Sequence, residues 1–258
     1  MPEGLEAEIY RRAANQTVGR TIRDVEVDDR QEMAADLVVA LPGATVERVR
    51  RHGKLVMLDL GNSQAACLGL HFGMTGRLVV DEVAPIAELE YASNRDDPSW
   101  DRFVITFDRG GRLRVNDPRR WARFVLDPDL GRLGPDFLTV TAEHLLRAFG
   151  RRGTPVKSAL LDQSVVAGYG NLCVDELLWQ VGIDPHRPAR EVPDATVTDL
   201  VAFARPHLRK MLRRGGSHRG TSAPEIRAAL PSCPRDGVPL KRSEVGGRTT
   251  VWCPGHQH

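Results

Sequence analysis

The first six residues carry groups that could act on a sugar aldehyde. Met1 precedes Pro2, a context that favours removal of the initiator methionine, and removal would leave Pro2 with a free secondary amine. An α-amino group has a pKa of about 7.7–8.0, so a useful fraction is an uncharged nucleophile at neutral pH. Attack by this amine on an aldehyde gives an iminium ion, the electron sink that β-elimination needs. Glu3 and Glu6 add two carboxylates that can transfer protons.

The same residues also fit an ordinary helix start. Proline is common in the first turn of a helix, and glutamate is favoured near its positive end. Apolar residues recur at helical spacing at Leu5, Ile9, Ala13 and Ala14. This spacing predicts a helix over roughly residues 3–16. If Met1 is retained, Pro2 lies within a peptide bond and has no nucleophilic amine, so the chemical interpretation depends on the rest of the chain.

Composition and charge bound the class of protein. The chain has 258 residues, 41% of them hydrophobic and 27% charged, which is enough for two domains with apolar cores. The net charge is +2, but arginines concentrate within residues 102–124 and 205–219. Such patches suit a polyanion, and a solvated basic face is the alternative.

The sequence shows no sign of secretion or of a membrane segment. Its N-terminus is acidic, and no apolar run approaches the roughly 18 residues that span a bilayer. Four cysteines, two of them near the C-terminal end, favour a reduced cytosolic protein with a metal site. We therefore expect a cytoplasmic protein without a membrane partner.

Hydrophobic periodicity divides the chain into a strand-rich part and a helical part. Alternating runs predict strands at 21–27, 45–50, 54–60, 66–70, 77–80, 103–107 and 113–115, with a hairpin turn at Asp108-Arg109-Gly110-Gly111. The polar stretch 82–99 is expected to be a mobile loop. Helical spacing predicts helices at 142–149, 155–163, 171–181 and 198–214, with a kink at Pro206. We expect an N-terminal domain over 1–127, a linker over 128–136, a helical domain over 137–222 and a hairpin module over 223–258.

Two local motifs in the second half suggest ligand binding. In Gly168-Tyr169-Gly170-Asn171, glycines precede a helix start whose unpaired N–H groups suit an anion such as phosphate, although a tight interhelical turn has the same composition. Near the end, Cys233-x-x-Asp236 and Cys253-x-x-His256 flank a strand-rich segment. Two knuckles of this kind predict a zinc-bearing β-hairpin. A metal-free hairpin is the alternative, and His258 is a possible substitute ligand.

Six motifs recur in an order that is characteristic of one enzyme family. They are Pro2-Glu3-x-x-Glu6; His52-Gly53-Lys54; Gly73-Met74-Thr75-Gly76; Asp117-Pro118-Arg119-Arg120-Trp121; Gly168-x-Gly170-Asn171 with Glu176; and Gly247-Arg248-Thr249-Thr250 before Cys253. Over almost its whole length the chain resembles the formamidopyrimidine-DNA glycosylase/endonuclease VIII family. The resemblance implies an α+β multidomain fold. Its parts are an N-terminal helix with a β-sandwich, a helix–two-turn–helix domain, and a zinc-finger-type β-hairpin.

The resemblance also implies roles for individual residues. Pro2 attacks C1′ and displaces the base, Glu3 is the main acid/base, and Glu6 helps to form the lesion pocket. Residues that grip the phosphates around the flipped nucleotide are Lys54, Asn171 and Arg248, with Lys157 as a further DNA contact. The wedge that fills the gap in the base stack consists of Met74, Arg119 and Trp121. Without the family context, the same residues would be a core filler, a solvated arginine and a core aromatic.

The implied function is that of a bifunctional DNA glycosylase/AP lyase of base excision repair. It would excise oxidised or ring-opened bases through a Pro2 Schiff base, followed by β- and δ-elimination. The expected partner is damaged double-stranded DNA in the bacterial nucleoid. The protein is expected to be a monomer with one structural zinc ion (Zn²⁺), held by Cys233, Asp236, Cys253 and His256, and with no organic cofactor.

Two departures from the family pattern leave the lesion open. Trp121 stands where formamidopyrimidine glycosylases usually have phenylalanine. Residues 215–232 are short for the loop that caps an oxidised purine in that branch. Candidate lesions are therefore oxidised pyrimidines, ring-opened purines and bulkier adducts. The alternatives are a non-catalytic lesion- or AP-site-binding protein of the same fold, a glycosylase specialised for bulky adducts, and a general zinc-ribbon module that binds nucleic acid.

Overall fold

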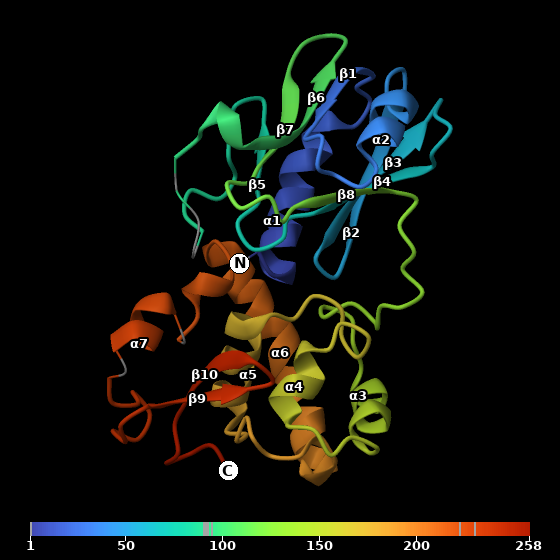
Figure 1. The fold of residues 1–258 in the computed structure, drawn as a ribbon. Coiled ribbons are helices and arrows are strands. Elements are labelled where there is room, and N and C mark those ends of the chain that lie inside the picture. The colour runs from blue at the N-terminus through green and yellow to red at the C-terminus, as the bar shows by residue number, and fades with distance from the viewer. Residues whose placement is uncertain (1, 90–92, 94, 222, 230) are drawn as a thin grey trace. The chain divides into compact units, whose positions relative to one another are not determined.

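Two antiparallel four-stranded sheets make up most of the N-terminal half of the chain (Figure 1). One sheet has the order β1 (Ile22–Val27), β6 (Asp101–Phe107), β7 (Arg112–Asn116) and β5 (Arg77–Val80). The other has the order β2 (Thr45–His52), β3 (Leu55–Gly61), β4 (Cys67–His71) and β8 (Arg123–Leu126). Two helices accompany them, α1 (Gly4–Ala14) and α2 (Ala34–Ala40).

The computed structural model describes residues 2–89, 93, 95–221, 223–229 and 231–258. Contacts within the chain divide these residues into two compact units. The first unit comprises Pro2 and residues 6–130, and the second comprises residues 3–5 and 131–258. The retention of Met1, on which the nucleophile depends, lies outside the described residues.

Side chains from both sheets and from α1 form the core of the first unit. Phe103, Ile105 and Phe107 alternate along β6 and are fully buried, as the period of a strand requires. Tyr10 of α1 enters the same core, where its ring lies 4.4 Å from that of Phe72. The predicted combination of an N-terminal helix with a β-sandwich is thus confirmed.

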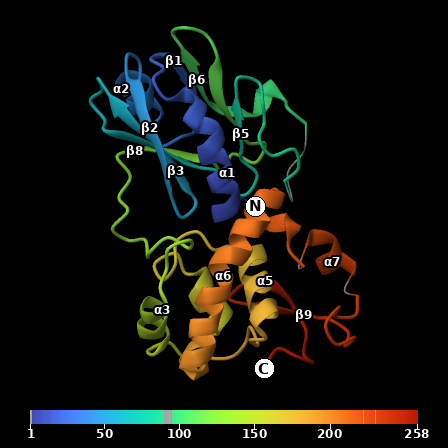
Figure 2. The same ribbon diagram turned by 180° about the vertical axis from the view of Figure 1, so that it is seen from behind.

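The second unit consists of helices and one hairpin. Its helices are α3 (Ala142–Phe149), α4 (Val156–Leu161), α5 (Asn171–Val181), α6 (Asp194–Arg214) and α7 (Pro224–Ala229), and the hairpin pairs β9 (Lys241–Val245) with β10 (Arg248–Trp252). Helices α5 and α6 run side by side, and β10 also contacts α5 (Figures 1 and 2). Helices α5 and α6 both end at glycines in the left-handed region, Gly182 and Gly215, where a side chain would be strained.

Most of the predicted elements appear within a few residues of their expected ends. The helices at 142–149 and 171–181 have the predicted bounds, whereas α6 begins at Asp194, four residues before the predicted start. The hairpin turn is also confirmed, because Gly110 and Gly111 have φ angles of 88° and 84°. The sequence pattern missed α2, a short valine-rich segment whose buried residue is Leu37. It also missed β8, which follows directly after an arginine-rich motif.

Part of the expected loop at 82–99 lies outside the described residues, namely 90–92 and 94. The described part contains a short 3-10 turn, Pro98–Trp100, in which Asp97 accepts hydrogen bonds from Ser99. Asp96 forms an ion pair with the buried Arg114, in which Oδ2 lies 2.8 Å from Nη2. Among the residues that the structure describes, no helix is long and apolar enough to cross a membrane.

Candidate active site

The carboxylate of Glu3 lies on the N-terminal end of α5. Its Oε1 accepts a hydrogen bond from the backbone N–H of Leu172 at 2.8 Å, and its Oε2 accepts one from Cys173 at 3.1 Å. Glu3 is 1% exposed. The anion that the helix start was expected to attract is therefore a carboxylate of the same chain, at least for these two N–H groups. The positive end of the helix also favours a negative charge at this point.

Glycines make this close approach possible. At Gly170, a Cβ would overlap the side chain of Glu3, so any other residue would displace the carboxylate. Gly168 has a φ of 113°, and its carbonyl accepts the N–H of Gly4 at 2.8 Å. The Gly-x-Gly-Asn motif thus fixes both Glu3 and the backbone after it.

Asn171 and Arg248 are brought near each other by the β9–β10 hairpin. The Asn171 amide donates to the carbonyl of Thr249 at 3.0 Å, one residue after Arg248. Arg248 is exposed at the start of β10. It follows a turn in which Gly246 and Gly247 have φ angles of 58° and 70°. The two predicted phosphate-binding residues therefore occupy the same edge of the second unit.

Lys157 occupies a different environment from that of an exposed DNA contact. Its side chain is fully buried, and its Nζ lies 2.6 Å from Asp175 Oδ1. The ammonium also donates to Thr250 Oγ1 at 2.8 Å and to the Thr249 carbonyl at 3.1 Å. Burial lowers the pKa of Lys157, and the Asp175 carboxylate acts in the opposite direction. The ammonium thus points to protein groups.

In the first unit, Lys54 lies in the turn that joins β2 to β3. Gly53 in this turn has a φ of 57°, and its carbonyl accepts a hydrogen bond from Arg51 at 2.8 Å. Arg51 in turn lies 3.3 Å from Glu8 of α1. This ion pair connects the Lys54 turn to the helix that begins just after Pro2. Glu6 of the same helix is also buried, at 1% exposed.

A single buried carboxylate organises the predicted wedge. Asp117 is fully buried and accepts the backbone N–H groups of Arg119 at 3.1 Å, Trp121 at 2.6 Å and Ala122 at 2.7 Å. It also accepts the hydroxyl of Thr75, the residue after Met74. The Met74 turn and the Arg119–Trp121 loop are therefore held by the same side chain, which accepts Thr75 from the first and backbone N–H groups from the second.

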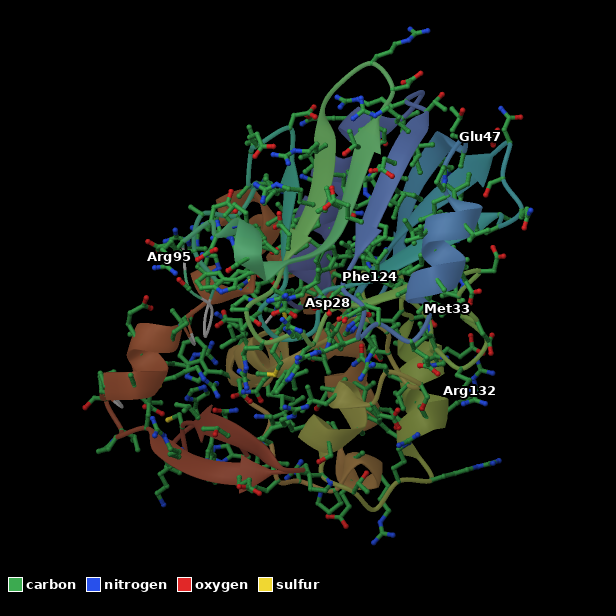
Figure 3. All side chains as sticks on the ribbon, turned by 45° about the horizontal axis from the view of Figure 1, so that its top comes forward. Asp28, Met33, Glu47, Arg95, Phe124 and Arg132 are labelled. Atoms are coloured by element: carbon green, nitrogen blue, oxygen red, sulfur yellow. The ribbon has the colours of Figure 1, made fainter. Side chains whose placement is uncertain are left out.

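Within this loop, Arg119 and Trp121 are both exposed and contact each other. The Arg119 guanidinium lies 3.9 Å from the centre of the Trp121 ring, and Trp121 is 45% exposed. An exposed tryptophan fits a wedge and not the alternative of a core aromatic. Beside the loop is a hollow of about 530 Å³, whose lining includes Asp28, Met33 and Phe124 (Figure 3).

His71 lies at the end of β4, next to the Met74 turn. Its Nδ1 accepts the N–H of Gly73 at 3.2 Å, so the ring carries its proton on Nε2. Burial lowers the pKa of His71 from 6.5 to about 4, and the charges of Lys54 and Arg123 act in the same direction. The imidazole is therefore neutral at neutral pH.

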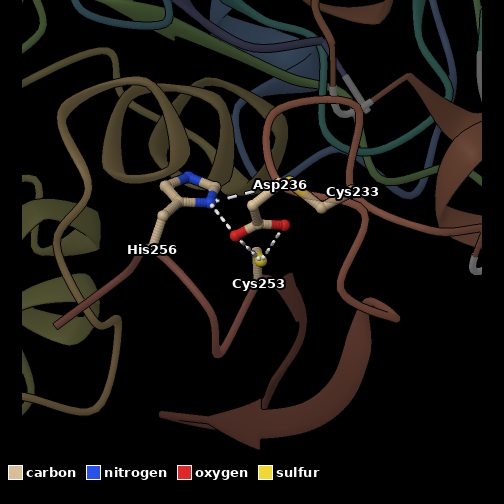
Figure 4. A group of neighbouring side chains, drawn as sticks. All are labelled: Cys233, Asp236, Cys253 and His256. Atoms are coloured by element: carbon tan, nitrogen blue, oxygen red, sulfur yellow. Dashed lines mark hydrogen bonds and ion pairs between the residues drawn. The ribbon is translucent and has the colours of Figure 1, made fainter.

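The four predicted metal ligands form one cluster (Figure 4). Their ligand atoms lie within 4.8 Å of one another. Asp236 Oδ2 is 3.2 Å from Cys253 Sγ and 3.3 Å from His256 Nδ1, and Cys233 Sγ is 3.6 Å from that nitrogen. Zinc bonds of about 2.0–2.3 Å would place tetrahedral ligand atoms about 3.3–3.8 Å apart, so these three separations are close to those of a zinc site.

The histidine of the cluster is oriented for metal binding. Its Nε2 donates to the carbonyl of Trp179 at 3.0 Å, which leaves the Nδ1 lone pair directed toward the other three ligands. Backbone N–H groups of Arg235 and Gly255 point at the two cysteine sulfurs, each at 3.4 Å. Such donors stabilise thiolates, the form of cysteine that binds metal. The cluster could therefore hold a metal ion.

Comparison with known proteins identifies the family. The model of the formamidopyrimidine-DNA glycosylase N-terminal domain matches residues 1–124, and that of the formamidopyrimidine-DNA glycosylase H2TH domain matches residues 133–222. A formamidopyrimidine-DNA glycosylase of Paracoccus denitrificans is 36% identical over 286 residues, covering 98% of this chain and 99% of the relative. The chain belongs to the formamidopyrimidine-DNA glycosylase family. A second relative, from Stenotrophomonas maltophilia, is 31% identical and covers 98% of both chains.

Solved structures of family members share the fold. The Lactococcus lactis enzyme in complex with DNA containing an abasic site has a TM-score of 0.81, with 23% identity and 99% of each chain covered. MutM in complex with DNA containing carbocyclic 8-oxo-G has a TM-score of 0.80, with 24% identity and 100% of each chain covered.

Residues outside the family motifs also contribute to the site. Asp175, Arg227 and His71 were not identified from the sequence, because a buried carboxylate or arginine in a short helix has no periodic signal. Asp117 belongs to a recognised motif, yet its role as an acceptor was not predicted. Of the predicted site residues outside the metal cluster, Pro2, Glu6, Lys54, Met74, Arg119 and Trp121 belong to the first unit, and Glu3, Lys157, Asn171 and Arg248 to the second.

Replacing Asp117 with asparagine should loosen the wedge loop. An amide would present an NH₂ group to N–H donors, leaving buried donors unsatisfied at about 1–3 kcal/mol each. We expect the Asp117→Asn variant to lose about 2–4 kcal/mol of unfolding free energy. Hydrogen exchange at the Trp121 and Ala122 amides should also increase, and by more than at other amides of the unit.

Thr75→Val and Asp108→Asn are the matched controls for this prediction. Thr75→Val removes one donor from the same carboxylate and should cost about 1 kcal/mol. Asp108 lies in an exposed turn, so its replacement should change neither stability nor exchange at Trp121. Unchanged protection of the Trp121 amide in Asp117→Asn would contradict the proposed acceptor role.

The low pKa of His71 predicts acid sensitivity. In the unfolded chain the ring takes up a proton near pH 6.5, whereas in the folded chain it stays neutral until about pH 4. The unfolded state therefore binds more protons, and stability falls as the pH drops from 6.5 to about 4. The expected loss is about 2–3 kcal/mol, measured by denaturant unfolding at pH 7 and pH 4.5.

His71→Asn should flatten this pH profile, because asparagine does not titrate and can still accept the N–H of Gly73. His258→Asn, at an exposed position, should leave the wild-type slope unchanged. Equal slopes for wild type and His71→Asn would show that another group causes the loss.

Proposed function

We propose that this chain is a bifunctional DNA glycosylase and AP lyase of base excision repair, with the amine of Pro2 as nucleophile. Family membership supports the reaction class. The observation that carries the residue roles is the fixed carboxylate of Glu3, the next residue after Pro2, on the N–H groups of α5. Because both of its oxygens accept backbone N–H groups, this carboxylate is held in one orientation, as a proton-transfer group requires.

The proposed reaction consists of base displacement, opening of the sugar, two eliminations and hydrolysis. The Pro2 nitrogen forms a bond to C1′ of the damaged nucleotide, the bond to the base breaks, and the base leaves with a proton taken from water. The Glu3 carboxylate takes up the proton that the Pro2 nitrogen loses and passes it to the ring oxygen, so that opening of the sugar gives an iminium ion. Loss of a proton from C2′ then expels the 3′ phosphate, and a second elimination expels the 5′ phosphate. Water hydrolyses the iminium ion and frees Pro2.

The DNA contacts follow from charge and shape. Lys54, Asn171 and Arg248 would bind the phosphates around the flipped nucleotide, since they offer an ammonium, an amide and a guanidinium. Met74, Arg119 and Trp121 would fill the space that the nucleotide leaves in the base stack. Glu6 would line the lesion pocket. The substrate is damaged double-stranded DNA, which places the enzyme at the nucleoid of a bacterial cell.

We propose zinc as the metal of the Cys233, Asp236, Cys253 and His256 cluster, with a structural role. Two thiolates, one imidazole and one carboxylate complete a tetrahedral set and leave no open position for catalysis. Zinc would connect the two ligands that precede the β9–β10 hairpin to the two that follow it. We treat residues 223–258 as a hairpin module that follows a helical domain at 137–222.

Borohydride trapping tests the nucleophile directly. Wild-type protein and a duplex with one abasic site should give a covalent complex, and peptide mapping should place the link on the Pro2 nitrogen. Pro2→Gly should trap far less, because a primary amine forms the iminium ion less readily. Intact mass must show whether Met1 is absent. Tight binding with no trapped complex in protein that lacks Met1 would mean that the fold serves lesion recognition alone.

Glu3→Gln separates chemistry from binding in the same assay. We expect excision to fall by a factor on the order of 10²–10⁴, the usual contribution of a general acid–base group, with affinity for the abasic duplex retained. Glu143→Gln, on the exposed side of α3, is the matched control and should behave as wild type. Normal turnover by Glu3→Gln would remove the assigned role.

Metal dependence gives an independent check on the hairpin. Elemental analysis should find about one zinc per chain, and Cys253→Ala should lose it together with DNA affinity, because Arg248 would no longer be held. Asp236→Cys supplies a softer ligand at the same position and should keep both properties. Full DNA affinity in metal-free protein would contradict the structural role.

A further inference from the structure

The carbonyl of Thr249, next to Arg248, accepts hydrogen bonds from three helices. The donors are Lys157 Nζ of α4 at 3.1 Å, Asn171 Nδ2 of α5 at 3.0 Å and Arg227 Nη2 of α7 at 2.8 Å. A carbonyl oxygen has two lone pairs, so three donors exceed its usual number of partners. This convergence fixes the backbone of the hairpin directly beside Arg248.

A buried charge cluster lies behind these bonds. The carboxylate of Asp175, 1% exposed, lies 2.6 Å from the Lys157 ammonium and also binds the Arg227 guanidinium. Its Oδ2 further accepts the N–H of Val251 in β10 at 3.4 Å. Two cations thus share one carboxylate, and loss of Asp175 would leave both of them buried without a counter-charge.

Arg227 is the member that connects the separate elements. Its fork binds Asp175 of α5 and the Thr249 carbonyl of β10, and its own carbonyl accepts Arg242 of β9 at 2.6 Å. Because Arg227 is 6% exposed, DNA cannot reach its guanidinium without a change in structure. Any effect of Arg227 on DNA binding must therefore act through another residue.

We propose that Arg227, Asp175 and Lys157 are positioning residues that set the spacing between Asn171 and Arg248. This inference rests on the proposed function, since it takes those two residues to be phosphate contacts. Asn171 is held by its own bond to the Thr249 carbonyl, and Arg248 is adjacent to that carbonyl in the chain. The cluster therefore keeps the amide and the guanidinium in register with two phosphates of the DNA backbone.

The salt dependence of binding is the readout that distinguishes this role. Each phosphate contact contributes about −0.9 to the slope of log K against log salt. If Arg227 holds Arg248 in place, Arg227→Met should remove about one unit of slope, although Arg227 itself contacts no phosphate. A variant that is merely less stable would bind in proportion to its folded fraction, with an unchanged slope.

The experiment is a double-mutant cycle. Each variant is titrated with a borohydride-reduced abasic duplex, and the binding constant is measured at several salt concentrations between about 50 and 200 mM. We expect Arg227→Met to bind about tenfold more weakly and Arg248→Ala to show a similar or larger loss. The double variant should be no weaker than Arg248→Ala alone, because both changes remove one contact. Combined with Lys54→Ala, by contrast, the loss from Arg227→Met should add in full.

Two further variants keep the test decisive. Arg152→Met removes a surface arginine that is paired with Asp162 in the same unit. Combined with Arg248→Ala, it should show no coupling energy. Arg227→Lys keeps the charge but cannot reach both Asp175 and Thr249, so it should give an intermediate slope even if Arg227→Met does not fold.

Additive losses for Arg227 and Arg248, or a wild-type slope in both Arg227 variants, would overturn the positioning role. Failure of the wild-type protein to bind or cleave abasic DNA would instead overturn the proposed function. The two failures are therefore distinguishable in one set of titrations.

Discussion

The bond between the Glu3 carboxylate and the first N–H groups of α5 is the interaction on which the catalytic end of the chain depends. It joins the third residue to residues 172 and 173 and fixes the carboxylate that is proposed to transfer protons. A helix start that was expected to bind an external anion supplies at least two of its N–H groups to this internal one. Such a bond needs a backbone without side chains at Gly170, which explains the glycine-rich turn in physical terms.

The sequence predicted the elements well and their long-range contacts poorly. Period-2 and helical patterns located most strands and helices, and the two cysteine motifs located the four residues that form the metal-ligand cluster. By contrast, α2 was missed because its exposed Val38 and Val39 fit neither a buried strand nor an amphipathic helix. The family resemblance predicted Lys157 as a DNA contact, but its side chain is fully buried. Its burial depends on Asp175 and Thr250, which lie far away in sequence, and local patterns carry no information about such partners.

Both units use one buried carboxylate to hold an arginine-bearing turn. In the first unit Asp117 accepts backbone N–H groups around Arg119 and Trp121. In the second, Asp175 binds two cations that fix the backbone beside Arg248. An exposed arginine loses conformational entropy when it binds DNA. A rigid backbone beneath it reduces this entropy cost, because the backbone is already ordered before binding. Although both carboxylates are buried, they would therefore influence the proposed DNA binding.

The hairpin that carries Arg248 is attached at both of its ends. A two-stranded ribbon of five residues a strand is not stable alone, so it depends on what holds it. The metal ligand Cys253 follows β10 directly, whereas Arg248 begins the same strand, about 16 Å away at the usual rise per residue. A metal at one end cannot by itself fix the other end, because a ribbon of this length twists and bends. The Arg227–Asp175–Lys157 cluster supplies the second attachment, at the end that is proposed to meet DNA. The position of Arg248 therefore depends on both attachments, the metal at the Cys253 end of the strand and the cluster at the Arg248 end.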